Sequence, residues 1–186
     1  HCAVMNQHQD FKPIRLAFGH KARVGKDTAA AYVCKKYNGQ SLRFATPVYE
    51  IAGLIQQYLG KPIQKDPGLL QLIGAGLREH YTPDIWANFV QAQIRAADPM
   101  QTLCITDMRF PNEMEMLKKE GFVIVKINRR DRVIDRDPNH ISEISLDNAT
   151  PDYNIDNDSD IDMLTDAIDQ IIRDRFPDHP LVAGAT

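Results

Sequence analysis

Residues 14–28 read IRLAFGHKARVGKDT, and this stretch decides the fold. Its apolar beginning, residues 14–18, predicts a strand, and the alanine-rich stretch from Asp27 to Tyr37 predicts a helix. Gly25 and Lys26 lie at the junction of the two, where successive backbone N–H groups and the helix dipole can surround phosphate oxygens. A strand, a loop with a Gly-Lys pair and a helix are together typical of a phosphate-binding P-loop.

The match to the P-loop pattern G-x-x-x-x-G-K-[ST] is imperfect. Gly19 lies one residue too far upstream, and Asp27 replaces the hydroxyl residue that normally reaches Mg²⁺. A carboxylate can take that place because Mg²⁺ prefers hard oxygen ligands. The alternative is a helix that is merely capped by Asp27 beside an exposed Lys26, but a cap requires neither Gly25 nor the apolar strand. We therefore expect the nucleotide phosphates near Gly19, Lys21, Gly25, Lys26, Asp27 and Thr28.

Short apolar runs alternate with amphipathic stretches along the rest of the chain. Strands are predicted at residues 42–45, 102–106, 122–127 and 153–155, and helices at residues 47–59, 69–80, 83–97, 111–120 and 160–175. This alternation predicts an α/β fold in which a parallel sheet of about five strands has helices on both faces.

We expect a single domain over residues 13–176. It contains a helical insert at about residues 47–100 and a charged segment at about residues 128–150. Insertions of this kind tend to hold specificity. Residues 1–12 are expected to be a flexible leader or a cloning remnant, and residues 177–186 a C-terminal tail.

The composition is that of a cytoplasmic globular protein. The 186 residues are enough to bury a core without a disulfide or metal, and a net charge of −3 argues against a dedicated nucleic-acid binder. Three cysteines without C-x-x-C spacing indicate a reducing compartment, and no apolar run is long enough to span a membrane. We expect no membrane and no stable nucleic-acid partner, and the sequence leaves a homodimer open.

A second apolar strand, residues 103–106, is followed by Asp107. In P-loop proteins such a strand points its acid toward Mg²⁺. Arg109, two residues later, can bind a phosphate with both arms of its guanidinium. Because many strands end in aspartate for turn chemistry, this assignment depends on the Gly25-Lys26 pair.

In this order the motifs resemble those of the deoxynucleoside monophosphate kinases of bacteriophages. GKDT at residues 25–28 and TDMRFPNE at residues 106–113 match the family's P-loop and its D-x-R-F-x-x-E strand end. Shorter matches are FATP at 44–47, LQ at 70–71 with Arg78 and then DIW at 84–86, HISE at 140–143 and YNIDN at 153–157. The resemblance covers about residues 14–172, and its specificity comes from the ordered set rather than from any one piece.

The resemblance implies a three-layer P-loop kinase that transfers the ATP γ-phosphoryl group to a deoxynucleoside monophosphate with Mg²⁺, in the cytoplasm of a bacterial host. Catalytic roles would fall to Lys26, Arg109, Arg130 and Arg132, the last two on a lid at about residues 128–150. Asp27 and Asp107 would hold Mg²⁺, and Asn157 would meet the adenine. The acceptor would be bound by Arg43, Arg78, Trp86, His140 and Glu143.

Several interpretations stay open at this stage. The lid arginines are nearly balanced by three aspartates, which also suits a solvated loop, and Trp86 suits core packing as well as base stacking. Residues 128–131 read NRRD and resemble the guanine-reading N-K-x-D motif of nucleotide switches, but Asp107 is not followed by the glycine of D-x-x-G. The acceptor could instead be a modified base in DNA, which the acidic net charge disfavours, or a small phosphorylated metabolite. A non-catalytic module on the same fold is the remaining alternative.

Overall fold

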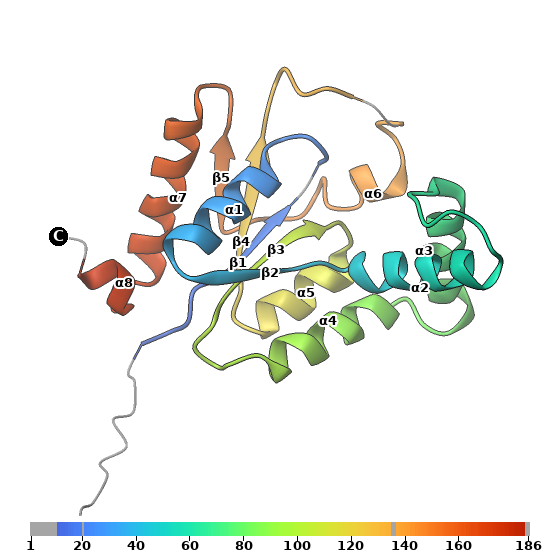
Figure 1. The fold of residues 1–186 in the computed structure, drawn as a ribbon. Helices are drawn as coiled ribbons and strands as arrows, with labels where there is room; N and C mark the ends of the chain where they lie inside the picture. The colour runs from blue at the N-terminus through green and yellow to red at the C-terminus, as the bar shows by residue number, and fades with distance from the viewer. Residues whose placement is uncertain (1–10, 20, 135–136, 185–186) are drawn as a thin grey trace, which may run out of the picture.

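The computed structural model describes residues 11–19, 21–134 and 137–184, without the side chains of residues 142 and 143. Its centre is one sheet of five parallel strands in the order β2-β3-β1-β4-β5 (Figure 1). The strands are β1 (Arg15–Gly19), β2 (Gly39–Leu42), β3 (Thr102–Met108), β4 (Val123–Asn128) and β5 (Tyr153–Asp156). The predicted α/β fold with about five parallel strands is confirmed.

The central strand β1 lies between β3 and β4, and all five of its residues are buried. Leu16 is opposite Cys104 on one side and Val123 on the other. Strands that are covered on both faces have continuous apolar sequences, and for this reason β1, β3 and β4 were predictable from the sequence. Gly19 pairs with Met108, so β1 and β3 end together and the loop after β1 lies beside Asp107.

The prediction of a strand at residues 42–45 was wrong in position. The strand β2 covers Gly39–Leu42 instead, and residues 43–45 lead into the next helix. As an edge strand β2 is hydrogen-bonded on one side only, to β3, and its Gln40 and Ser41 are exposed. An edge strand of this kind has no continuous apolar run, so hydrophobic patterning does not detect it.

Helices cover both faces of the sheet (Figure 1). Helix α1 (Lys26–Lys36) and helix α7 (Ile161–Arg175) share one apolar core with β1 and β4, and α4 (Ile85–Ala96) and α5 (Pro111–Lys119) share the other. Two further helices, α2 (Thr46–Tyr58) and α3 (Pro67–His80), lie beside the sheet and close the second core. Two short helices were not predicted, α6 (Ile141–Ile144) and α8 (Pro180–Ala183).

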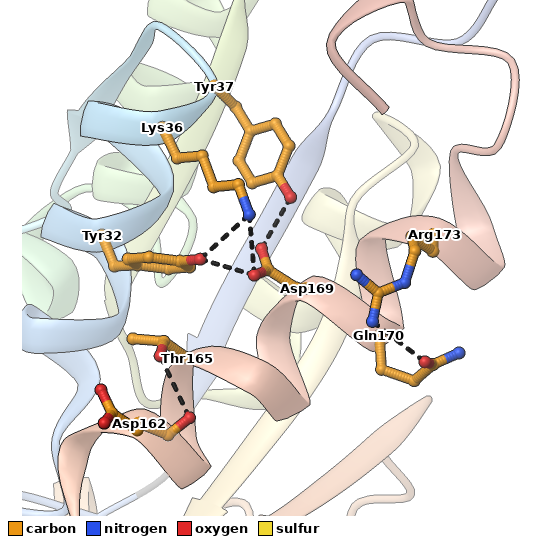
Figure 2. Close-up of polar contacts among 8 residues, drawn as sticks. All are labelled: Tyr32, Lys36, Tyr37, Asp162, Thr165, Asp169, Gln170 and Arg173. Atoms are coloured by element: carbon orange, nitrogen blue, oxygen red, sulfur yellow. Dashed lines mark hydrogen bonds and ion pairs between the residues drawn. The ribbon is translucent and has the colours of Figure 1, made fainter. Parts of the chain in front are cut away.

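One buried carboxylate joins α1 to α7 (Figure 2). Asp169 of α7 accepts hydrogen bonds from the hydroxyls of Tyr32 and Tyr37, at 2.5 and 2.7 Å, and from Lys36 Nζ at 2.8 Å. Tyr32 and Lys36 belong to the last two turns of α1, and Tyr37 is its C-cap residue. This cluster fixes the far end of the helix whose first residues follow the phosphate loop.

Candidate active site

The loop after β1 turns sharply before it enters α1. Arg23 has a φ of 58° and Gly25 a φ of 106°, a left-handed conformation that is easy for glycine and unfavourable for other residues. A Cβ on Gly25 would also lie 2.6 Å from Asn157 Nδ2. Position 25 therefore requires glycine both for its backbone conformation and for the close approach of Asn157.

Asn157 supports this loop from the end of β5. Its side chain is buried, and Nδ2 donates a hydrogen bond of 2.9 Å to the carbonyl oxygen of Val24. The prediction that Asn157 meets the adenine of ATP stays a prediction. In the structure the side-chain amide donates to the loop backbone and so supports the loop.

A cavity of about 650 Å³ opens over the loop and the start of α1. Lys26, the first residue of α1, is only 7% exposed and lines it. We call it the donor cavity, because residues predicted to bind the phosphates of the donor nucleotide line it. Seven basic and three acidic side chains surround it: Arg23, Lys26, Arg43, Lys65, Arg109, Arg129 and Arg132 with Asp27, Asp107 and Asp131. An excess of cations at a helix N-terminus suits a polyanion such as the phosphate chain of a nucleotide.

The two residues that precede α2 hold the side chain of Asp107 in place. Its two carboxylate oxygens accept hydrogen bonds of 3.0 Å from the backbone N–H groups of Phe44 and Ala45. Burial raises the pKa of Asp107, and these two N–H groups and nearby arginines oppose the rise. The carboxyl group thus ties the end of β3 to the beginning of the α2 segment.

Asp27 and Asp107 line the same cavity and could hold Mg²⁺ with the help of a nucleotide. Asp27 is exposed and forms an ion pair of 2.8 Å with Arg43. Among the described residues no group of three histidines, cysteines or acids gathers around a common point. One or two carboxylates completed by substrate phosphates and water are what Mg²⁺ usually binds, so this pair fits the ion.

A second cavity, of about 700 Å³, lies between α2, α3, α4 and the start of α5. We call it the acceptor cavity, because residues predicted to bind the acceptor line it. Its walls are largely apolar, with Phe44, Val48, Leu70 and Phe110 among them. Eight polar side chains also line it: Tyr49, Gln71, Arg78, Glu79, Asp107, Arg109, Glu113 and His140. A largely apolar pocket with a small number of polar groups is the usual form of a small-molecule site.

Two residues predicted to bind the acceptor, Trp86 and Arg78, line this second cavity, and each has a defined contact. Trp86 is 8% exposed, and its Nε1 donates a hydrogen bond of 2.9 Å to the carbonyl oxygen of Gly74, which joins α4 to α3. The ring is thus a core residue that also forms part of the cavity wall. The guanidinium of Arg78 stacks on the ring of Phe110, 3.9 Å from its centroid.

The two cavities meet at Asp107 and Arg109, which line both. Both residues come from the end of β3 or the loop after it, beside the phosphate loop. A group bound in the donor cavity and a group bound in the acceptor cavity would therefore approach each other here.

Some of the other predicted site residues line a cavity, and some do not. Gly19 packs against Met108, and Lys21 pairs with Asp147 at 3.3 Å; neither lines the donor cavity. Arg132 does line it and donates to the carbonyl oxygen of Ala22, whereas the Arg130 side chain is 90% exposed and lies 3.4 Å from Asp158. Thr28 and Arg43 line the donor cavity and His140 the acceptor cavity, and the Glu143 side chain lies outside the described part of the chain.

Sequence reasoning missed three residues that line the cavities. Arg23 and Lys65 were not assigned to the phosphate site, and Glu113 was not assigned to the acceptor site. Arg129 belongs to the predicted lid segment, and it lines the donor cavity. Lys65 lies between α2 and α3, and no local pattern marks it. Glu113 had a signal, because it is the last residue of the D-x-R-F-x-x-E motif.

Within the described ranges, no helix combines the length and apolar character needed to cross a bilayer. A search of curated protein sequences finds no match to this chain. Among solved structures, one described as a "putative kinase" from Chloroflexus aurantiacus J-10-fl is similar over 89% of this chain and 99% of its own, with a TM-score of 0.51 and 11% identity. At that identity the likeness shows the fold alone.

A sequence model of one family provides the remaining comparison. The model, described as deoxynucleotide monophosphate kinase, matches residues 68–168, which is 101 of the 186 residues. The matched range runs from α3 through the end of β3 and the acceptor cavity to α7. The chain therefore belongs to the deoxynucleotide monophosphate kinase family and is a nucleoside monophosphate kinase.

Proposed function

We propose that this enzyme transfers the γ-phosphoryl group of ATP to a deoxynucleoside monophosphate, with deoxynucleoside diphosphate and ADP as products. The observation that supports this most is the meeting of the two cavities at Asp107 and Arg109. Phosphoryl transfer requires the donor and acceptor oxygens in line, with the moving group between them. A basic cavity that opens onto a largely apolar one meets that requirement.

In the donor cavity, Lys26 and the loop N–H groups bind the phosphate chain. Lys26 reaches the β- and γ-phosphates from the first turn of α1, where the helix dipole adds to its charge. Asp27 and Asp107 would hold Mg²⁺, which would offset negative charge on the phosphates. Asn157 keeps the loop in this shape through its bond to the Val24 carbonyl.

At the junction, cations offset the charge of the moving group. Arg109 faces both cavities, and Arg43 at the end of β2 lies near enough to pair with Asp27. Arg129 and Arg132 line the donor cavity from the segment after β4, which acts as a cover that excludes water. In phosphoryl-transfer enzymes an arginine at this point contributes about 10³ to 10⁵ in rate.

The acceptor cavity suits one mononucleotide. Its volume of about 700 Å³ lies within the range of small-molecule pockets, and its aromatic and aliphatic walls suit a base. Arg78, held on the Phe110 ring, supplies a cation for the nucleotide. The net charge of −3 disfavours a long polyanion such as duplex DNA as the acceptor.

A coupled assay of ADP release tests this function. We would supply ATP and Mg²⁺ with dAMP, dGMP, dCMP, dTMP and 5-modified pyrimidine deoxynucleotides in turn, with duplex DNA and deoxyribose 5-phosphate as comparison acceptors. We expect release of ADP that depends on at least one free deoxynucleotide and exceeds that with either comparison acceptor. If no free nucleotide stimulates ADP release, the proposal is wrong; slow hydrolysis of tightly bound GTP without any acceptor would favour a switch.

A further inference from the structure

Glu113 is a buried acid on the acceptor cavity to which the proposed reaction assigns no role. It is the third residue of α5 and is 6% exposed. Its Oε1 accepts hydrogen bonds from the backbone N–H groups of Arg109, at 2.9 Å, and Phe110, at 3.0 Å. This is the glutamate half of a capping box; phenylalanine at the N-cap has no oxygen to supply the other half.

The two carboxyl oxygens of Glu113 differ in what they can do. Oε1 already accepts two N–H groups, so a proton on this carboxyl belongs on Oε2. Oε2 has no hydrogen-bond partner among the described residues, although the side chain forms part of the cavity wall. In its neutral form Glu113 therefore offers one O–H donor toward the cavity, and a buried donor gains most when a ligand accepts from it.

The surroundings bring the ionisation of this carboxyl close to neutral pH. Burial raises the pKa of Glu113 to about 7; the charge of Asp107 adds to the rise, and the two N–H groups and Arg78 oppose it. The other charged and titratable side chains around the same cavity are Tyr49, Arg78, Glu79, Asp107, Arg109 and His140. A phosphate dianion that enters this cavity disfavours the ionised form of Glu113 further, because like charges repel at short range.

We propose that neutral Glu113 is a hydrogen-bond donor of the acceptor cavity, and that Oε2–H binds an oxygen of the incoming nucleotide. Acceptor binding then takes up a proton from solvent wherever the free enzyme is ionised at this site. The inference depends on the proposed function, since it concerns the acceptor of that reaction. Glu113 is then a specificity residue. It selects nucleotides that present a hydrogen-bond-accepting oxygen at this point, and it links their binding to pH.

The test measures proton uptake on acceptor binding to the full chain. Calorimetric titration of the most active deoxynucleotide, in buffers of different ionisation enthalpy at about pH 7 and pH 8, gives the number of protons taken up. If only the neutral form binds, the wild-type KM for the acceptor rises about fivefold between those two pH values. The phosphate monoester itself ionises at about pH 6. The informative quantities are therefore the differences in proton uptake and in the rise of KM between wild type and the variants.

Glu113→Gln is the central variant. Its amide oxygen can accept the same two N–H groups, and its NH₂ group supplies a donor that does not titrate. We expect Glu113→Gln to bind the acceptor at about pH 7 within threefold of wild type, to take up fewer protons, and to lose the excess rise in KM. Glu113→Ala, which lacks the donor, should bind more weakly at both pH values. Glu115→Gln, on an exposed residue of α5 that pairs with Lys119, is the matched control and should behave as wild type.

Each outcome decides the inference. Equal proton uptake by wild type and Glu113→Gln overturns it, as does an acceptor affinity of Glu113→Gln as weak as that of Glu113→Ala while both melt at the wild-type temperature. With deoxyribose 5-phosphate as ligand, wild type and Glu113→Gln are compared again. If their proton uptake still differs, the bond is made to a sugar or phosphate oxygen; if it no longer differs, the bond is made to the base. If wild type binds ATP but no acceptor, the proposed function fails as well; if wild type turns over an acceptor, only the inference is at stake.

Discussion

Lys26 begins α1 with 7% of its surface exposed, although lysine is rarely buried. Burying an ammonium group costs free energy unless negative charge lies close by. Seven basic side chains, Lys26 included, and three aspartates line its cavity, and this excess of positive charge favours the binding of an anion. A lysine selected for stability alone would not be placed among so many like charges.

We therefore expect Lys26→Ala to lower kcat by about 10² or more, because one charge-stabilising donor is lost from the transition state. The fold should be retained, since the substitution removes a buried charge rather than a packed apolar group. The measurement is the coupled ADP-release assay with saturating ATP, together with a thermal melt. Lys35→Ala, on an exposed lysine of the same helix, is the control. A Lys26→Ala variant with most of its activity would show that the phosphate loop is misassigned.

At the scale of elements, α1 is positioned from both ends. Its first residues follow the phosphate loop, and its last turns are held to α7 by Asp169 (Figure 2). Burial by itself raises the pKa of Asp169, but the bonds from Lys36, Tyr32 and Tyr37 outweigh it, and the net pKa lies below the ordinary value. The ionised carboxylate is therefore the form that joins the two helices.

Asp169→Asn should lower the free energy of unfolding by about 1.5–3 kcal/mol, the contribution of hydrogen bonds to a charged group. The native pKa is lowered, so this contribution is fully present above about pH 4, the unfolded pKa, and is lost as the pH falls through the native pKa. Urea unfolding at neutral and acidic pH should show the gap between wild type and variant closing only in acid. Asp166→Asn, on an exposed residue of α7, should leave stability unchanged. A gap that stays constant in acid would contradict this role.

Helices α3 and α4 form the wall of the acceptor cavity, and Trp86 joins them. Because Trp86 is the only tryptophan in the chain, its fluorescence reports on this wall. We expect the emission to change when a deoxynucleoside monophosphate is added and to change little with a non-hydrolysable ATP analogue alone. Trp86→Phe should abolish the signal and cost about 1 kcal/mol of stability through the lost bond to Gly74. An equal response to the ATP analogue would place the donor, not the acceptor, beside α4.

For the whole molecule, the donor cavity is formed by segments distant in sequence: the loop after β1, Lys65, the end of β3 and residues 129–133. A ligand that binds all of them stabilises the folded state alone. An ATP analogue with Mg²⁺ at about 100 times its Kd should raise the free energy of unfolding by about 2.7 kcal/mol and the melting temperature by about 5–10 °C. Differential scanning fluorimetry measures the shift, and hydrogen exchange should show protection at residues 22–28 and 129–133 but not in α8. A shift of the same size in Lys26→Ala would mean that the analogue binds elsewhere.

The sequence by itself determined the features that depend on neighbours along the chain. Buried parallel strands require continuous apolar runs, so β1, β3 and β4 were predicted close to their observed positions. The Gly25-Lys26 pair and the Asp107 to Arg109 turn were also visible, because their residues follow strands directly and parallel strands end at one edge of the sheet. The family followed from the order of these local motifs.

Only the tertiary structure decided which distant side chains converge. In the structure, Lys65 and Arg129 line the donor cavity, whereas Arg130 is exposed. Asn157 lies against the phosphate loop, and Glu113 lies in the wall of the acceptor cavity. The strand β2 covers residues 39–42. Lys65 and the position of β2 had no local sequence signal, and the contacts of all these residues depend on strand order and helix packing between residues far apart in the chain. Local patterns specify the elements and the chemistry at their ends, and the packing of those elements selects the side chains that share a site.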